Sequence, residues 1–333
     1  MNALDDLLKH LADDGQTLSI ARLYGLSGLE KADLGRVREA WPSIPDDRRQ
    51  AIVRHLDDIA EANFEVDFGS VFRIGLADAD PGVRAAAIDG LWEDQDLKLI
   101  PTLIDMLRQD DSEDVRAAAG GSLGRFVLAG ELEEIPAAKL DQVVEALREV
   151  IDDPDETLEV RRRALEAIGY SSAEGVPELI DEAYHDPEDL MRISAVFAMG
   201  RSADPKWAER VLAETDSDSP QMRFEAARAL GELQYPDAVP ALTRLLDDPD
   251  DQVREASVWA LGQIGGREPR RLITAILDDE NASDLHEVAQ TALDELEFLS
   301  DDNLNFALME FDGNGDDEDD DDDDEEDDTE LDD

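Results

Sequence analysis

Histidines and carboxylates are the side chains in this sequence that could bind metals or move protons. The 333-residue chain has 86 acidic residues, no cysteine and four histidines, which are His10, His55, His185 and His286. Without thiolates, and with histidines this far apart, the chain shows no transition-metal ligand set. The sequence therefore predicts no metal centre and no bound cofactor.

Residues 312–316, Asp-Gly-Asn-Gly-Asp, imitate the start of a calcium-binding loop because oxygen-bearing side chains stand at alternate positions. Such a loop needs glycine at its sixth position to make its turn, and this segment has Asp317 there and Asp323 at the twelfth position. A solvated acidic run explains the segment better than a calcium site.

Catalytic constellations are missing from the sequence. Carboxylates are so numerous that proximity alone identifies no acid–base pair, and the chain has neither a glycine-rich phosphate loop nor a serine nucleophile elbow. We therefore expect no catalytic residues and predict that the protein is not an enzyme.

The net charge restricts the choice of partner. With 30 basic residues the formal charge is -56, which repels nucleic acids and anionic membrane surfaces and favours a basic protein. Solubility and adaptation to a salty cytoplasm are alternative explanations, and five lysines against 25 arginines favour the second. Without a signal peptide or an apolar run of about 20 residues, we expect a cytoplasmic monomer.

One phrase recurs seven times along the chain. An apolar residue precedes a basic one, and a small residue and a large apolar residue follow three and seven positions later. The basic residues are Arg84, Arg116, Arg161, Arg192, Arg223, Arg254 and His286, at spacings of 32, 45, 31, 31, 31 and 32 residues. Offsets of -1, +3 and +7 lie on one stripe of an α-helix, so each phrase predicts a core-facing helix.

Glycine and proline complete the repeat. The glycines end the predicted helix or occupy its tightly packed last turn, and they are Gly124, Gly169, Gly200, Gly231 and Gly262. The prolines open the intervening helices, where the missing N–H costs nothing, and they are Pro101, Pro177, Pro240 and Pro269. Each unit therefore reads as two helices that must stack on neighbouring units, which predicts an all-α solenoid.

These columns resemble the HEAT-repeat family, and the short period with its V-R-x-x-A-x-x-x-L-G phrase resembles the phycobilisome-lyase type of HEAT-like repeat. The resemblance implies a right-handed α–α superhelix with an Asp–Arg ladder between units. The candidate ladder residues, with each aspartate six positions before its arginine, are Asp78, Arg84, Asp110, Arg116, Asp155, Arg161, Asp186, Arg192, Asp248 and Arg254. Ser217 stands where Arg223 would need its aspartate.

The resemblance also bears on the last histidine. Deoxyhypusine hydroxylases of the HEAT type bind iron through several His-Glu pairs, whereas this chain has the single pair His286-Glu287. A di-iron site is therefore not expected, and we expect His286 to replace a ladder arginine and to face Glu280.

The sequence divides into four predicted regions: an N-terminal helical cap over 1–45, the solenoid over 46–299, a capping segment over 300–311, and a disordered Asp/Glu-rich tail over 312–333. The long step between Arg116 and Arg161 predicts a longer helix or loop near residues 129–136, and hence a break in regularity.

A partner-binding surface is predicted on the concave side. Offsets +1, +2 and +5 from the basic residue should face it, and they supply Phe197, Phe224, Arg228, Trp259, Arg163 and Ile193. Aromatic and arginine side chains dominate interface energetics. The alternative is that the rings pack between helices.

We therefore predict a non-catalytic scaffold that binds a protein partner in its groove, with the acidic tail favouring basic partners. One alternative is a lyase-like or enzyme-assisting protein of the chromophore-lyase type. Another is a polyanionic chaperone or nucleic-acid mimic.

Overall fold

The computed structural model describes residues 3–298, and this part of the chain is entirely helical, with eighteen α-helices and no β-strand. The predicted all-α solenoid is confirmed. The capping segment predicted over 300–311 and the tail predicted over 312–333 lie outside the described residues.

Seven helix pairs follow an N-terminal group of helices. That group contains α1 (Ala3–Ala12), α2 (Ile20–Leu23), α3 (Lys31–Ala40) and α4 (Asp46–Ala62), with the 3-10 turns η1 (Tyr24–Leu26) and η2 (Trp41–Ser43). The first helices of the pairs are α5 (Gly69–Gly75), α7 (Leu99–Gln109), α9 (Ala137–Asp152), α11 (Val176–Tyr184), α13 (Ala208–Glu214), α15 (Val239–Leu245) and α17 (Arg267–Asp278). The second helices are α6 (Pro81–Asp89), α8 (Glu113–Glu131), α10 (Leu158–Ile168), α12 (Asp189–Arg201), α14 (Pro220–Glu232), α16 (Asp251–Ile264) and α18 (His286–Phe298). The turns η3 (Pro205–Trp207), η4 (Pro236–Ala238) and η5 (Glu280–Leu285) precede α13, α15 and α18.

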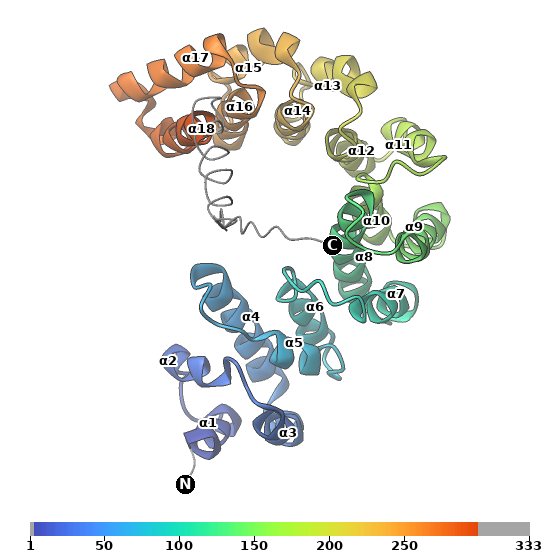
Figure 1. The fold of residues 1–333 in the computed structure, drawn as a ribbon, viewed down its shortest axis with the longest axis vertical. Helices are drawn as coiled ribbons and strands as arrows, with labels where there is room; N and C mark the ends of the chain where they lie inside the picture. The colour runs from blue at the N-terminus through green and yellow to red at the C-terminus, as the bar shows by residue number, and fades with distance from the viewer. Residues whose placement is uncertain (1–2, 299–333) are drawn as a thin grey trace, which may run out of the picture.

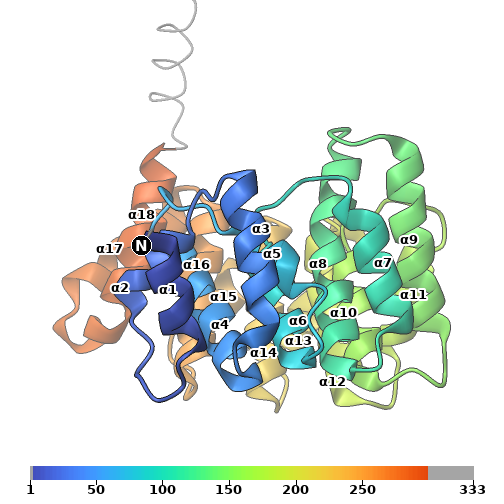
Figure 2. The same ribbon diagram turned by 90° about the horizontal axis from the view of Figure 1, so that it is seen from below.

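The pairs stack side by side into an open C (Figure 1). The second helices, together with α4, line the inside of the C, and the first helices form its outer rim. Figure 2 shows that most helices run along the direction of view of Figure 1. The inner surface is therefore built from one helix of each pair, so residues at equivalent positions of successive repeats lie beside one another.

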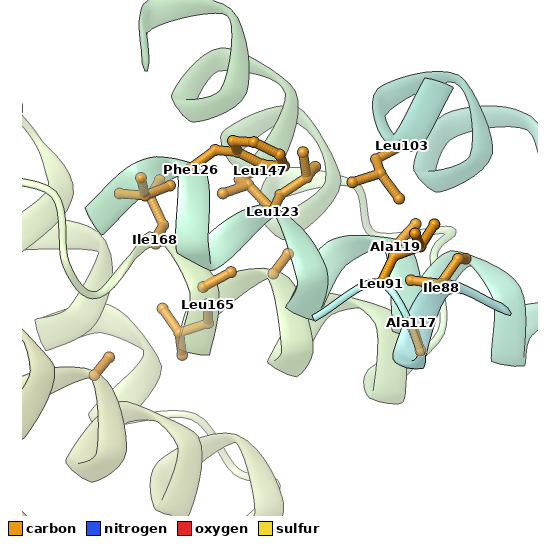
Figure 3. Packing of buried hydrophobic residues seen from close by; sticks show 14 of the residues in the cluster. Ile88, Leu91, Leu103, Ala117, Ala119, Leu123, Phe126, Leu147, Leu165 and Ile168 are labelled. Carbon is orange, nitrogen blue, oxygen red and sulfur yellow. The ribbon is translucent and has the colours of Figure 1, made fainter. Parts of the chain in front are cut away.

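The predicted stripe forms the core. In the first six repeats, the residues at offsets -1, +3 and +7 from the arginine are at most 5% exposed. Figure 3 shows this packing around α8, where Leu123 lies among Leu103 and Leu147 of the outer helices. Burial of large aliphatic side chains supplies about 1.5 to 3 kcal/mol each, so stacking is the main source of stability.

The repeated glycines allow successive inner helices to approach closely. A Cβ atom on Gly169 or on Gly200 would lie 2.8 Å from the Cα atom of Ala198 or of Ala229 in the next inner helix. None of the five glycines has a positive φ, and α8, α12, α14 and α16 all continue beyond theirs. The glycine is therefore needed for space rather than for a left-handed turn, and only Gly169 stands at a helix end.

The long step in the repeat lengthens two helices. Helix α8 has 19 residues and α9 has 16, and Glu133 takes a positive φ of 61° in the connection between them. The connection projects beyond neighbouring repeats in Figure 2. The side chain of Leu140 lies against Gly130, where a Cβ atom would meet it at 2.8 Å. The extra residues therefore extend the packed core between α8 and α9.

Candidate partner-binding surface

The repeated arginines join neighbouring repeats. Nε and Nη2 of Arg84 donate to the carboxylate of Asp110 in the next repeat at 2.8 and 2.7 Å, and Nη1 donates to the carbonyl of Asp78 at 2.9 Å. Arg223 makes the same bidentate contact with Asp248, at 2.7 and 2.8 Å. Such a planar fork matches both carboxylate oxygens, and a bidentate pair of this kind is stronger than an ion pair with a single contact.

The partner assignment within the ladder corrects the prediction. The residue six positions before the arginine supplies its backbone carbonyl, which any residue type can offer, and the carboxylate comes from the following repeat. The carbonyl of Ser217 therefore accepts a hydrogen bond from Nη1 of Arg223 at 2.9 Å, as in most of the other repeats. Its missing carboxylate affects Arg192, which pairs instead with Asp189 of its own helix.

The ladder is also irregular beside the long step. Arg116 pairs with Glu156, at 2.8 and 2.9 Å, rather than with Asp155, which is exposed. Arg161 donates to the carbonyl of Ile151 at 2.9 Å. Asp155 is therefore not a ladder residue, because the longer glutamate beside it reaches the arginine.

Of the remaining ladder residues, Asp186 lacks an arginine partner within the described residues and Arg254 has a carboxylate partner. Asp186 accepts a hydrogen bond from the backbone N–H of Glu188 at 2.8 Å, and no ion pair to an arginine of the described chain is found for it. Arg254 pairs with Asp284 of the last repeat at 2.6 Å. Within residues 3–298 the Asp186 carboxylate therefore pairs neither with Arg192, as predicted, nor with Arg161 of the preceding repeat.

The last histidine differs from its expected contact. Nε2 of His286 lies 3.0 Å from the carbonyl oxygen of Asp279, and no side-chain contact with Glu280 is found in the described part of the chain. His286 takes the carbonyl contact of a ladder arginine without its carboxylate contact.

The ladder begins one inner helix earlier than the repeated phrase predicts, at α4 instead of α6. Nε and Nη2 of Arg49 donate to Asp78 at 2.7 and 2.8 Å, and the indole N–H of Trp41 donates at 2.6 Å. Burial alone would raise the pKa of Asp78, but these hydrogen bonds hold that pKa below its ordinary value. The sequence could have indicated this step through Ile52 and Leu56, which stand three and seven positions after Arg49 as in the repeated phrase.

Inner helices α12, α14 and α16 carry the predicted aromatic residues, and we call Phe197, Phe224, Glu225, Arg228 and Trp259 the aromatic patch. The guanidinium of Arg228 lies over the Trp259 ring, 4.7 Å from its centroid. Phe224 and Trp259 are half-buried and pack against the core, while part of each side chain stays accessible. The rings therefore serve both packing and surface.

Two predicted residues lie elsewhere. Ile193 is 4% exposed and belongs to the core, which corrects its assignment to the binding surface. Arg163 lies on the inner helix α10, where it pairs with Glu159 and Glu166 at 2.9 and 3.0 Å. It is half-exposed, but its helix precedes α12, the first helix of the aromatic patch, by one repeat.

Glu225 is the acidic residue of the aromatic patch. Burial is the main cause that raises its pKa to about 7, and repulsion by Glu166 adds to it. Within the described residues its carboxylate forms no hydrogen bond or ion pair. Sequence reasoning missed Glu225 because its environment depends on neighbouring helices, while its residue type is common everywhere in this chain.

A second polar group borders the patch. Arg201 pairs with Glu232 at 3.3 Å and lies over the Phe197 ring at 5.0 Å from its centroid. Burial raises the pKa of Glu232 above its ordinary value. The inner face here combines aromatic surface with carboxylates that are poorly solvated, an arrangement that attracts a cation with an apolar stem.

Residues 3–298 contain no group of three or more His, Asp or Glu side chains placed to hold a metal ion. No helix in this range combines the length and the apolar character that crossing a bilayer requires.

Residues 70–158 and 208–294, together more than half of the chain, match the family model of HEAT repeats. A comparison with curated proteins found no match. The chain is similar to the complex of CpcE and CpcF of phycocyanin lyase from Nostoc sp. PCC7120, with a TM-score of 0.52 and 17% identity over 86% of this chain and 97% of that chain.

Two further solved structures are similar. One is YibA of E. coli, with a TM-score of 0.44 and 18% identity over 85% of this chain and 98% of that one. The other is human deoxyhypusine hydroxylase, with a TM-score of 0.34 and 22% identity over 78% and 95% of the two chains. Identities this low concern the fold alone.

Proposed function

Because the chain belongs to the HEAT-repeat family, we propose that it is a non-catalytic scaffold that holds a segment of a protein partner on its inner face. The partner segment is basic and lies across the aromatic patch. The scaffold acts as a monomer, and the acidic residues 312–333 attract the same partner at longer range.

Glu225 is the observation that carries this proposal. Glu225 is half-buried and forms no ion pair within the described residues, so the loss of hydration makes its charge unfavourable in the free protein although Arg228 and Arg162 attract it. A lysine or arginine of a partner supplies the missing charge, and the neighbouring rings of Phe224 and Trp259 contact its aliphatic stem. Binding therefore compensates a cost that is built into the free surface.

Selection from a library of displayed random peptides tests the proposal for a partner segment of any sequence. We expect the immobilised wild-type protein to enrich peptides that combine lysine or arginine with apolar residues. Their affinity should fall with added salt, because charge attraction is screened. Enrichment of acidic peptides, or of none, contradicts the proposal.

Variants then locate the binding site. Selected peptides should bind Glu225→Gln and Trp259→Ser at least about tenfold more weakly than the wild type, since each change removes a central contact. Glu145→Gln, an exposed position on the outer helix α9, removes the same charge away from the inner face and should leave affinity unchanged. Equal losses in all three variants would mean that overall charge alone attracts the peptides.

The lyase-type alternative is supported by likeness to the CpcE–CpcF complex, which at 17% identity is a likeness of fold. The polyanion alternative places all binding in residues 312–333. Deleting those residues distinguishes the two proposals. The polyanion alternative expects binding to be lost, whereas the scaffold proposal expects the selected peptides still to bind, with a slower association rate.

A further inference from the structure

A hollow of about 700 Å³ opens on the inner face among α4, α6, α8 and the start of α10. The aromatic patch lies on other helices. At the eighth position after the basic residue, five repeats have the glycine that lets inner helices approach, whereas α4 has Asp57 and the turn after α6 has Trp92. Both side chains line the hollow, which therefore lies where larger residues replace that glycine.

Four of the five carboxylates that line the hollow form no ion pair within the described residues; the fifth, Glu159, pairs with arginines of its own helix. The four are Asp57, Glu61, Asp89 and Asp114. One carboxylate oxygen of Asp57 is buried without a hydrogen-bond partner, and neither Asp57 nor Asp89 forms an ion pair within the described residues. Burial, together with repulsion from Glu61 and Asp89, raises the pKa of Asp57 to about 6. Burial also raises the pKa of Asp89.

The two arginines of the hollow differ in their contacts. Arg125 donates to the carbonyls of Asp94 and Ser122 at 3.1 and 3.0 Å, its Nη2 is buried without a hydrogen-bond partner, and it forms no ion pair within the described residues. Arg163 pairs with two glutamates of its own helix, at 2.9 and 3.0 Å. Four unpaired carboxylates thus face one unpaired arginine, so the net charge of the hollow is negative, and three of these carboxylates lie on α4 and α6.

An aromatic wall and a small-residue floor complete the hollow. Trp92 is 48% exposed, which is unusual for so large an apolar side chain, and it lines the hollow together with Ala85, Ala117 and Gly121. A half-exposed indole beside carboxylates is an environment that binds guanidinium and alkylammonium groups. The small floor residues leave room for the stem of such a group.

We propose that this hollow receives a lysine or arginine side chain of a protein partner, held between Asp57 and Asp89 and against Trp92. This proposal rests on the proposed function in one respect only, which is that the partner is a protein with basic residues. It is a second anchor, distinct from the aromatic patch, and it accounts for carboxylates that the patch does not use.

Nuclear magnetic resonance of the indole N–H of Trp92 tests the site, with an acetylated peptide of alternating glycine and arginine as the probe. Trp92→Phe assigns the resonance. We expect the arginine peptide to shift it saturably, and the same peptide with neutral citrulline in place of arginine to leave it unchanged. The double variant Asp57→Asn/Asp89→Asn should bind the arginine peptide at least about tenfold more weakly.

The matched control is Asp105→Asn/Glu145→Gln, which removes two charges from exposed positions of the outer helices α7 and α9. It should bind like the wild type. The double variant in the hollow should fold, because both of its carboxylates resist ionisation in the folded state. Circular dichroism checks this.

Three results overturn the proposal: an unshifted Trp92 resonance, an equal shift with the citrulline peptide, or an equal loss of affinity in the control variant. The last result would mean diffuse attraction to a polyanion. If the hollow fails in this way while peptides selected on the wild type still require Trp259, the scaffold proposal stands without its second anchor.

Discussion

Replacing Glu225 by glutamine tests the electrostatics of the inner face. Burial, and then repulsion from Glu166, raises the pKa of Glu225 from 4.5 to about 7. The folded protein thus binds this proton more tightly than the unfolded chain does. Its contribution to stability is complete below about pH 4.5 and is lost as the pH rises through about 7.

The size of the effect follows from that pKa difference. At 1.36 kcal/mol per pKa unit, the charged form of Glu225 costs about 3 kcal/mol in the folded state. Residual solvent around this half-buried side chain reduces the expected value to about 2 kcal/mol. Glutamine keeps the shape and cannot ionise, so Glu225→Gln should be about 2 kcal/mol more stable than the wild type near pH 8 and equal to it near pH 4.

Urea unfolding followed by circular dichroism measures this difference at both pH values. Amide hydrogen exchange in α14 adds a local reading, since repeat arrays need not unfold in one step. Glu145→Gln, which is exposed, should change little at either pH. A stabilisation of Glu225→Gln that is the same at both pH values, or a loss of stability near pH 8, would refute the reasoning.

Three further predictions concern the solenoid itself. Gly200→Ala should destabilise by about 1 to 3 kcal/mol in thermal unfolding, because its Cβ meets the next inner helix at 2.8 Å, whereas Gly35→Ala, which meets nothing within 4 Å, should be neutral or stabilising. Equal effects would mean that the close approach is unimportant. Arg223→Gln should lower the free energy of unfolding by about 2 kcal/mol, because it leaves the buried carboxylate of Asp248 unpaired. Arg192→Gln should cost less than about 0.5 kcal/mol, because its exposed partner lies in the same helix. A reversed order of the two costs would contradict the ladder. Asp78→Asn should destabilise near pH 7 and progressively less as the pH falls below the ordinary value of 3.8, because a lowered pKa gives stability that is lost as the pH falls. Urea midpoints measured over this range would show a constant difference if the ladder charge were irrelevant.

The repeat columns predicted the fold well because they report local, periodic burial. Val115, Ala119 and Leu123 lie on one helical stripe in the sequence, and all three are fully buried. The glycine after the stripe was predicted either to end the helix or to occupy a tightly packed last turn. Its close contact with the next repeat shows that its role is in packing. A helix face can thus be read from one sequence, while the identity of its neighbour requires the stack.

The site was less predictable for the same reason. The ladder aspartates were assigned to the arginine six residues later, although Asp110 belongs to Arg84 of the preceding repeat. Ile193 and Phe224 both stand one position after their arginine, yet Ile193 lies in the core whereas Phe224 is half-buried. Asp57 and Glu225 differ from other carboxylates only in the helices around them, and no sequence signal distinguishes them.

The uneven ladder has a mechanical consequence. Units that touch only their neighbours behave as springs in series, so bending concentrates in the most compliant interfaces. Arg161 and Arg192 reach no carboxylate of the next repeat among the described residues, which leaves two consecutive interfaces, α10 to α12 and α12 to α14, without this cross-link. These joints lie between the hollow and most of the aromatic patch. A partner that bound both the hollow and the aromatic patch would bend the solenoid at those joints. The distance between its two binding residues would then determine how wide the C opens.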